Sequence, residues 1–278
     1  MAHATANGLS IGYRTGGHGR WLVLVTGRGA TMADWTPLLV RQLTRHNRVL
    51  VFDNRGMGTT DAGPVPPGQV TVPLMARDTL ALAGALGIGR FDLMGWSMGG
   101  EIAQQVAVDA PRRVRRLVLC ATSAGGPTEV PPSASVRAVL DEPDLPTATL
   151  LNLSFPRTPA GSRASQAYAA RVVAQAEADH LPSGSFTATS TGQAGQLHAR
   201  TQWTAAGGGV YGDLAGLGMP ALVMWGSRDV VVPPANDRLI VGKLRHATRR
   251  VYPGTGHAFL FQDPVGVGKA VDGFLDRS

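Results

Sequence analysis

The hydrophobic pattern of this chain alternates between two periods. Short, nearly continuous apolar runs are separated by longer segments whose apolar residues recur at helical spacing. Continuous apolar runs are typical of strands that are buried on both faces of a parallel sheet, so the alternation predicts successive βαβ units. The predicted strands are 21–26, 49–53, 91–96 and 117–121, and the predicted helices are 32–45, 73–86 and 98–109.

The same alternation returns at the end of the chain and is preceded by a different signal at its start. Strands are expected at 221–225 and 248–252, with helices at 235–244 and 263–275. Residues 2–14 are expected to form a hairpin, because Asn-Gly at 7–8 is a strong two-residue turn signal. The predicted fold class is therefore α/β, with a mostly parallel, doubly wound sheet.

Between residues 123 and 210 the alternation lapses. This segment contains no comparable strand run and is rich in Ala, Ser, Thr, Gly and Pro. It is nearly neutral, with five Arg and six acidic residues, although the whole chain carries a net charge of +7. Helices are expected at 134–140, 164–179 and 193–206. We interpret 123–210 as a helical lid inserted into a core domain formed by 1–122 and 211–278.

The basic residues are clustered, and their positions limit the choice of partner. Each cluster directly precedes a predicted strand, and in a parallel sheet these positions share one rim, opposite the carboxyl ends where ligands bind. No aromatic residues are interleaved for base stacking, so a nucleic-acid partner is not expected, whereas an acidic protein at this basic rim stays open. The clusters are Arg41, Arg45, His46 and Arg48; Arg112, Arg113, Arg115 and Arg116; and Arg245, His246, Arg249 and Arg250.

The cysteine content and the lack of long apolar runs limit the class of protein further. The single cysteine, Cys120, lies within an apolar run and excludes an internal disulfide and a cysteine-rich metal site. Neither a signal-like segment nor an apolar run of spanning length is present, so we expect a cytoplasmic protein without a membrane partner. No cofactor or metal is expected, and the sequence leaves the oligomeric state open.

The most informative stretch is Gly-Trp-Ser-Met-Gly-Gly at 95–100. It follows a predicted strand and opens a predicted helix, which is the context that a nucleophile elbow requires. The turn is so tight that the residues two places from the serine must lack side chains, and Gly95 and Gly99 meet this demand. Ser97 is then the candidate nucleophile. The alternative is a glycine-rich turn whose serine only caps a helix.

A serine hydroxyl needs a base, and the base needs a carboxylate to orient it. His257 is the only one of the seven histidines in a Gly-rich loop directly after a predicted core strand. Asp229 follows the preceding strand, with Asp213 and Asp237 as rival carboxylates. All three candidate residues, Ser97, Asp229 and His257, therefore leave carboxyl ends of strands in one sheet, in the order expected of such an enzyme.

These motifs resemble the α/β-hydrolase fold superfamily, in its serine-nucleophile esterase, lactonase and peroxidase-like branch with a short helical lid. The matching stretches are 95–100, Asp-Asn-Arg-Gly-Met-Gly at 53–58, Trp-Gly-Ser-Arg-Asp at 225–229 and Gly-Thr-Gly-His at 254–257. The resemblance implies that the backbone N–H groups of Arg28 and Met98 form the oxyanion hole. It also implies that Asp53 and Arg55 brace the loop beside the nucleophile.

One departure from the family pattern concerns the loop after the first core strand. Many members carry His-Gly before the first oxyanion residue, whereas this chain has Thr-Gly-Arg at 26–28. The hole needs only the backbone N–H, so activity does not depend on the missing histidine. The change places a guanidinium near the pocket mouth, where the Arg28 side chain either meets a polar substrate group, pairs with the lid or turns to solvent.

The expected function is that of a serine hydrolase that cleaves an ester, lactone or thioester of a small, largely apolar substrate through an acyl-enzyme. The alternatives are a C–C bond hydrolase, and a non-hydrolytic cyclase, epimerase or ligand-binding protein that uses the same pocket in natural-product metabolism. An aspartate nucleophile, as in epoxide and haloalkane hydrolases, is excluded by Ser97. The expected pocket residues are Trp96, Leu151, Leu153, Phe155, Phe186 and Trp203.

Overall fold

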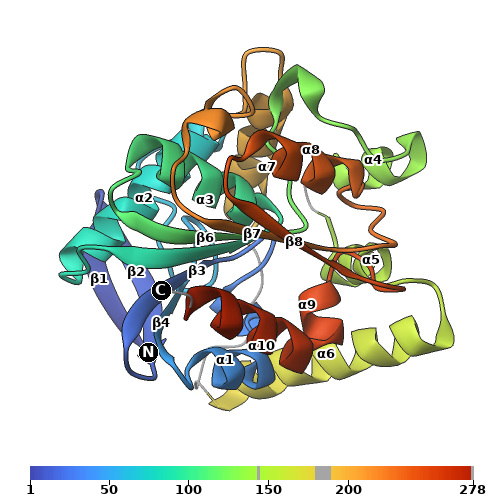
Figure 1. Cartoon of the computed structure of the whole chain (residues 1–278), viewed down its shortest axis with the longest axis horizontal. Coiled ribbons are helices and arrows are strands. Elements are labelled where there is room, and N and C mark those ends of the chain that lie inside the picture. Colours follow the sequence, from blue (N-terminus) through green and yellow to red (C-terminus); the bar gives the residue numbers. More distant parts are fainter. Residues whose placement is uncertain (143–144, 179–188, 277–278) are drawn as a thin grey trace.

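A computed structural model describes residues 1–142, 145–178 and 189–276 of the chain. An eight-stranded sheet crosses the molecule, with helices on both of its faces (Figure 1). Its strand order is β1-β2-β4-β3-β5-β6-β7-β8. The β1–β2 and β2–β4 pairs are antiparallel and the pairs from β4 to β8 are parallel, which confirms the predicted mostly parallel α/β sheet.

The strands follow the predicted apolar runs closely. Asn7 and Gly8 form the hairpin turn with positive φ values of 48° and 74°, as the Asn-Gly signal predicts. The strands are β1 Ala2–Ala6, β2 Leu9–Gly16, β3 Arg20–Val25, β4 Asn47–Phe52, β5 Phe91–Trp96, β6 Val114–Cys120, β7 Ala221–Gly226 and β8 Ala247–Tyr252.

The helices divide between the two faces of the sheet. In Figure 1, α2, α3 and α8 lie on one face, and α1 and α10 lie on the other. The helices of the core are α1 Pro37–Leu43, α2 Val72–Ala85, α3 Met98–Asp109, α8 Ala235–Lys243, α9 Phe259–Gln262 and α10 Pro264–Leu275. Short 3₁₀ turns are η1 Met32–Asp34, η2 Pro67–Gln69, η3 Gly126–Thr128 and η4 Asp213–Gly216.

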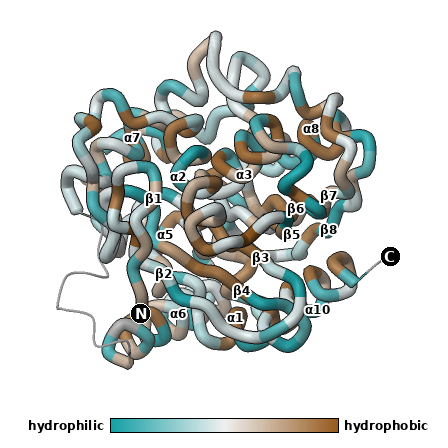
Figure 2. Tube along the Cα trace, turned by 90° about the vertical axis from the view of Figure 1, so that its left-hand side faces the viewer, coloured by the Kyte–Doolittle hydropathy of each residue, from teal (hydrophilic) through white to brown (hydrophobic). Residues whose placement is uncertain are grey.

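Each face of the sheet has its own hydrophobic core. One core packs α2 and α3 against the sheet, and the other packs α1, α9 and α10 against its opposite face. Alternate residues of a strand point to opposite faces, so Leu93 of β5 belongs to the first core and Met94 to the second. In Figure 2 the hydrophobic stretches accordingly lie around β3 and its neighbours in the middle of the molecule.

In the described residues between β6 and β7, which leave out 143–144 and 179–188, lie four helices that we call the inserted helices. They are α4 Ala134–Leu140, α5 Thr147–Ser154, α6 Pro159–Ala178 and α7 Ser190–Thr204. Three were expected from the sequence and α5 was not. Tyr168 of α6 donates a hydrogen bond to Asp34 of η1 and stacks on Phe261 of α9, with ring centroids 4.7 Å apart. The inserted helices are thus packed directly onto the core.

The expected helix at 32–45 was wrong in detail, because it is split in two. Thr31 caps η1 with a capping box to Asp34, and the chain then turns before α1. Proline favours the first helical position and disfavours a helical residue before it, so Pro37 starts a new helix instead of extending the first.

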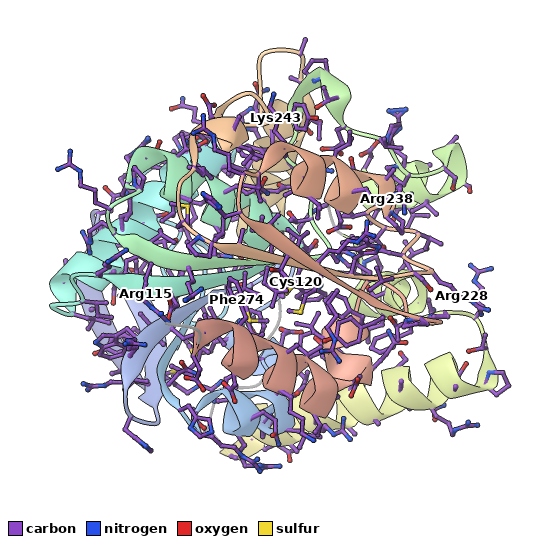
Figure 3. The ribbon with its side chains drawn as sticks, in the orientation of Figure 1. Arg115, Cys120, Arg228, Arg238, Lys243 and Phe274 are labelled. Atoms are coloured by element: carbon purple, nitrogen blue, oxygen red, sulfur yellow. The ribbon has the colours of Figure 1, made fainter. Side chains whose placement is uncertain are left out.

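Several arginines of the basic rim have partners within the fold. Arg115 forms a 2.6 Å ion pair with Asp92 and also hydrogen-bonds the carbonyl of Leu275. Arg48 lies over the ring of Trp21, and Arg116 lies over Phe274. Figure 3 shows Arg115 near Phe274, at the end of the sheet away from Arg228. These arginines therefore have partners within the protein itself. An acidic protein partner at the basic rim stays a prediction. None of the described helices is long and apolar enough to span a bilayer.

Candidate active site

The nucleophile elbow has the strained geometry that its sequence predicts. Ser97 joins β5 to α3 with φ 57° and ψ −126°, a backbone conformation that non-glycine residues rarely adopt. A Cβ on Gly95 would lie 2.1 Å from the carbonyl oxygen of Gly99, and one on Gly99 would lie 2.1 Å from that of Val25. The two glycines therefore permit the turn. The half-buried Ser97 faces the cavity at the carboxyl end of the sheet.

His257 and Asp229 meet as the strand order predicts. His257 Nδ1 lies 2.8 Å from Asp229 Oδ2, and both side chains are buried. Asp229 Oδ1 accepts backbone hydrogen bonds from Val231 and Val232, at 2.8 and 2.9 Å, which fix the carboxylate. The indole of Trp96 donates to the carbonyl of His257 at 3.1 Å and so holds the histidine loop.

Ser97 and His257 line the same cavity, and no hydrogen bond joins them among the described residues. Hydrogen bonds between catalytic groups are often long before substrate binds, so this does not weigh against a serine–histidine pair. The carboxylate contacts Nδ1, so Nε2 is the imidazole nitrogen that does not face it.

Neither rival carboxylate contacts His257 among the described residues. Asp213 begins η4 and Asp237 lies in α8, where it accepts a hydrogen bond from Thr122 N at 3.2 Å. Burial, and then the nearby charge of Asp229, raise the pKa of Asp237 well above its usual value. Both effects favour the protonated form of Asp237, and Asp229 is the carboxylate that contacts the histidine.

The expected oxyanion-hole residues lie on two elements beside Ser97. Met98 is the first residue of α3, and Arg28 lies in the loop 26–30 that follows β3. Neither backbone N–H donates to another residue in the described part of the chain. Gly27 allows close approach here, since a Cβ on it would lie 3.1 Å from Ser97 Cβ. Two unpaired N–H groups next to a serine are the donors that a developing oxyanion requires.

The Arg28 side chain pairs with the inserted helices, which was one of the three expectations. Its guanidinium donates to the carbonyls of Leu140 and, at 3.0 Å, Glu142, at the end of α4. Burial lowers the Arg28 pKa to about 10; nearby Asp141 raises it and nearby Arg200 lowers it. The guanidinium thus binds the last carbonyl of α4 and one carbonyl of the segment that follows it.

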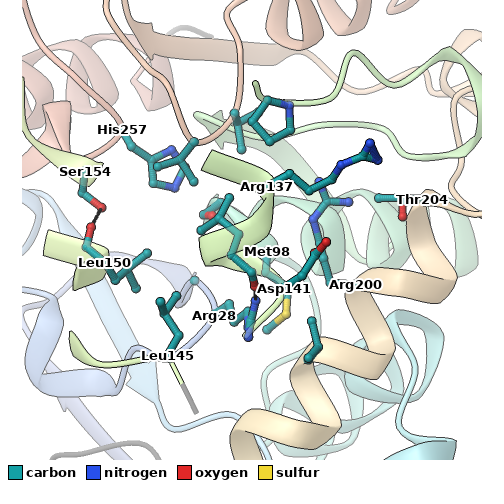
Figure 4. A pocket seen from close by; sticks show the side chains of 18 of the residues that line it. Arg28, Met98, Arg137, Asp141, Leu145, Leu150, Ser154, Arg200, Thr204 and His257 are labelled. Atoms are coloured by element: carbon teal, nitrogen blue, oxygen red, sulfur yellow. Dashed lines mark hydrogen bonds between the residues drawn. The ribbon is translucent and has the colours of Figure 1, made fainter. Parts of the chain in front are cut away.

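A cavity of about 410 Å³ opens over Ser97 and His257. Its lining differs from one side to the other (Figure 4). Leu145, Leu150 and Ser154 lie on the side of His257, whereas Arg137, Arg200 and Thr204 lie on the opposite side. The cavity therefore has one mainly apolar wall and one polar wall.

Of the expected pocket residues, Trp96 lines this cavity and several others do not. Helix α5 contributes Leu150 and Ser154 to the cavity lining, and these residues lie four positions apart on one face of the helix. Leu151, Leu153, Phe155 and Trp203 are absent from the lining, and three of them pack in the cores instead. Phe155 lies against the ring of Tyr168, and Trp203 packs on Gly125. Leu151 packs against the hydrophobic core that contains α1, α9 and α10. Phe186 lies outside the described residues.

A buried charge cluster that sequence reasoning missed connects α7 to the nucleophile helix. Arg200 Nε lies 3.2 Å from Glu101 in the first turn of α3, and its guanidinium also forms an ion pair with Glu129. Ser123 donates to Glu129 at 2.7 Å. The signal was weak, because Glu101 and Arg200 occur singly within helices that appear only amphipathic.

The Glu101 cluster predicts a pH-dependent stability. Burial raises the pKa of Glu101 to about 7; Glu129 also raises it, while Arg200 and a Ser123 hydrogen bond lower it. A raised acid pKa contributes stability that is present below the unfolded value, here 4.5, and is lost as the pH rises through the folded value. We expect Glu101→Gln to gain on the order of 2 kcal/mol relative to wild type between pH 5 and pH 8. Urea unfolding at both pH values measures this, and a pH-independent difference would contradict it.

The structure also shows how Asp53 and Arg55 brace the loop beside the nucleophile. Asp53 accepts hydrogen bonds from Met32 N at 2.6 Å and Thr59 N at 2.9 Å. Arg55 forms a buried, bidentate pair with Asp78, with both distances 2.7 Å. Within the described residues, no group of three or more His, Cys, Asp or Glu side chains is placed to hold a metal ion.

A family model described as alpha/beta hydrolase fold matches residues 20–264, which is most of the chain. The chain belongs to the alpha/beta hydrolase fold family. The alignments with the first two curated relatives span 40% and 12% of those proteins, and the hydrolase name of the first supports an enzymatic function. The family assignment agrees with the resemblance that the motifs at 53–58, 95–100, 225–229 and 254–257 carry.

Three relatives of this alpha/beta hydrolase show how far the similarity extends. RutD of Agrobacterium fabrum, described as a carbamate hydrolase, is 35% identical over 106 residues, 38% of this chain and 40% of that protein. Polyketide synthase ThaQ of Burkholderia thailandensis is 29% identical over 95% of this chain, which corresponds to 12% of ThaQ. The enol-lactonase of Burkholderia xenovorans has a TM-score of 0.80 at 24% identity, covering 99% of this chain and 100% of that one, and shows the shared fold.

Proposed function

We propose that this protein is a serine hydrolase that cleaves an ester, lactone or thioester bond through an acyl-enzyme. The observation that carries the proposal is the convergence of three groups on one cavity: the strained Ser97, the His257–Asp229 pair and two unpaired backbone N–H groups. Acyl transfer needs a nucleophile, a base with its orienting carboxylate and oxyanion donors at one site, and these groups support that assignment.

The chemistry follows from these positions. Ser97 Oγ attacks the substrate carbonyl while His257 Nε2 takes its proton, and the N–H groups of Arg28 and Met98 bind the oxyanion. Collapse of this intermediate expels the alcohol or thiol, which takes its proton from His257. A water, deprotonated by His257, then attacks the acyl-enzyme and releases the acid and Ser97. Asp229 holds the imidazole in the correct tautomer throughout.

The two walls of the cavity favour a small substrate that has both apolar and polar surface. Leu145 and Leu150 offer apolar contacts on the side of His257, and Arg137 and Arg200 offer polar contacts on the opposite side. The half-buried Arg200 forms ion pairs with Glu101 and Glu129, whereas Arg137 is exposed and makes no side-chain hydrogen bond or ion pair to other described residues. We therefore favour a substrate with an apolar part and a polar end.

A second candidate is a non-hydrolytic role in assembling a natural product. The similarity to part of ThaQ, described as a polyketide synthase, covers 95% of this chain and favours this alternative. The same pocket would then position a substrate for cyclisation or epimerisation, with His257 moving protons and Ser97 forming no acyl-enzyme. C–C bond hydrolysis remains a further alternative within the hydrolases.

A fluorophosphonate probe tests the proposed nucleophile. We expect one rapid adduct, which peptide mapping assigns to Ser97, because this serine stands at the strained elbow in the cavity with His257, whereas the Ser154 hydroxyl in the same cavity donates to the carbonyl of Leu150. The adduct should form at least about 100-fold more slowly in His257→Ala, since the serine then lacks its base. Rapid labelling of another serine, or equal labelling of both proteins, would contradict the proposal.

A further inference from the structure

We propose that the inserted helix α7 positions the oxyanion hole, with Gln196 as the residue that fixes the Arg28 side of it. This proposal rests on the proposed serine hydrolase function. Gln196 does not line the cavity, so it acts through the backbone of the loop 26–30 and not on the substrate.

The contact between Gln196 and the loop is direct and buried. Gln196 is 0% exposed, and its Oε1 accepts a hydrogen bond from Gly29 N at 2.8 Å. This N–H belongs to the peptide group that follows Arg28, and Gly29 has a positive φ of 71°. The loop's own support is weak, because its backbone bond within the described residues, Ala30 N to Gly27 O, measures 3.3 Å. Gln196 therefore sets the orientation of the backbone next to the Arg28 N–H.

One helical turn further on, α7 also contacts the element that carries the other oxyanion donor. Residues four apart lie on the same helix face, so Gln196 and Arg200 project from α7 together. Arg200 pairs with Glu101 in the first turn of α3, the helix that Met98 begins. Figure 4 shows Arg28, Met98 and Arg200 around one cavity. Helix α7 thus touches both halves of the oxyanion hole.

The helix itself is held against the core, which makes it a fixed reference. A Cβ on Gly192 would lie 2.1 Å from the carbonyl oxygen of Gly56, so the two backbones are in close contact. Thr189 donates to the same oxygen at 2.7 Å, and His198 Nδ1 lies 2.8 Å from the carbonyl of Val70. An element anchored at several points can hold the Gly29 N–H within a narrow range of positions.

The NH₂ group of the Gln196 side chain allows an effect on catalysis to be told apart from an effect on stability. Its Nε2 is buried and has no hydrogen-bond partner among the described residues. Replacement by methionine leaves the Gly29 N–H unpaired but also removes this unpaired donor, so the two effects on stability oppose each other. For catalysis there is no such compensation, because the variant only loses the acceptor that holds the Gly29 N–H.

The test compares Gln196→Met, Gln196→Glu and Gln202→Met with the wild type. Gln202 is exposed on the same helix and lies outside the cavity lining, so it is the matched control. The readouts are kcat and KM for p-nitrophenyl butyrate, the inhibition constant of a butaneboronic acid, and Tm. The boronic acid forms a tetrahedral adduct with the serine and so reports the oxyanion hole.

In Gln196→Met we expect kcat to fall about 10- to 100-fold and boronate inhibition to weaken in parallel, with KM changed less than about threefold. Gln196→Glu retains an acceptor oxygen and should recover most of kcat, and Gln202→Met should match the wild type. A kcat within twofold of wild type in Gln196→Met would overturn the positioning role of Gln196 and leave the proposed hydrolase function standing. A loss of kcat that follows the loss of Tm in all variants would do the same. A wild type that neither turns over esters nor reacts at Ser97 overturns the proposed function as well.

Discussion

Ser97→Ala is expected to lower kcat by at least about 10³-fold while leaving the fold intact. The hydroxyl is the group that forms the covalent intermediate, so its removal leaves only the oxyanion hole and substrate binding. Alanine keeps the β-carbon of serine, and the strained φ of 57° is no worse for alanine than for serine. The measurement is steady-state hydrolysis of p-nitrophenyl butyrate, with circular dichroism to check folding.

Ser154→Ala is the matched control for this prediction. Ser154 lines the same cavity, but its hydroxyl donates to the carbonyl of Leu150 at 2.8 Å within α5. Its loss should cost less than about tenfold in kcat, because no bond to the substrate forms there. Equal losses in Ser97→Ala and Ser154→Ala would mean that both act through cavity shape, and retention of the rate in Ser97→Ala would favour the non-hydrolytic alternative.

Asp229→Asn is expected to lower kcat/KM by about 10³- to 10⁴-fold, whereas Asp237→Asn should stay within about tenfold of wild type. An amide at position 229 cannot reliably accept the Nδ1–H of His257, so the imidazole adopts the wrong tautomer. Asp237 is buried and contacts Thr122 N, and an asparagine oxygen can still accept that hydrogen bond. The same ester assay measures both variants.

The two variants form a strict pair, because both remove an ionisable carboxyl from neighbouring buried sites. The order of their effects is therefore the informative result. A larger loss in Asp237→Asn than in Asp229→Asn would contradict the assignment of the orienting carboxylate. Thermal unfolding of both variants separates this outcome from a general loss of stability.

The strands and the elbow were predictable because their signals are local. Continuous apolar runs mark strands that are buried on both faces, and the Gly-x-Ser-x-Gly pattern lies within five residues. The contact that requires Gly95 is local as well, whereas the one that requires Gly99 comes from the Val25 carbonyl of β3. The helix α9 was missed for the opposite reason. With four residues, it is too short for an apolar period to show.

The pocket lining was less predictable because hydrophobicity does not give direction. Leu150 and Leu151 are adjacent and equally apolar, yet Leu150 faces the cavity and Leu151 the core. Phe155 was expected in the pocket, but its contact with Tyr168 places it in an aromatic cluster. Gln196 and Arg200 gave no signal, since polar side chains on a helix predict a solvated face, and only tertiary packing buries them.

The acyl-enzyme is the central claim, and rapid-quench mass spectrometry of the enzyme with p-nitrophenyl butyrate tests it most directly. The protein is mixed with excess ester, quenched in acid within the first turnover and digested. The account predicts a mass increase of one butyryl group on the peptide that carries Ser97, formed as fast as the burst of nitrophenol. Full turnover with unmodified Ser97 at every quench time would contradict it.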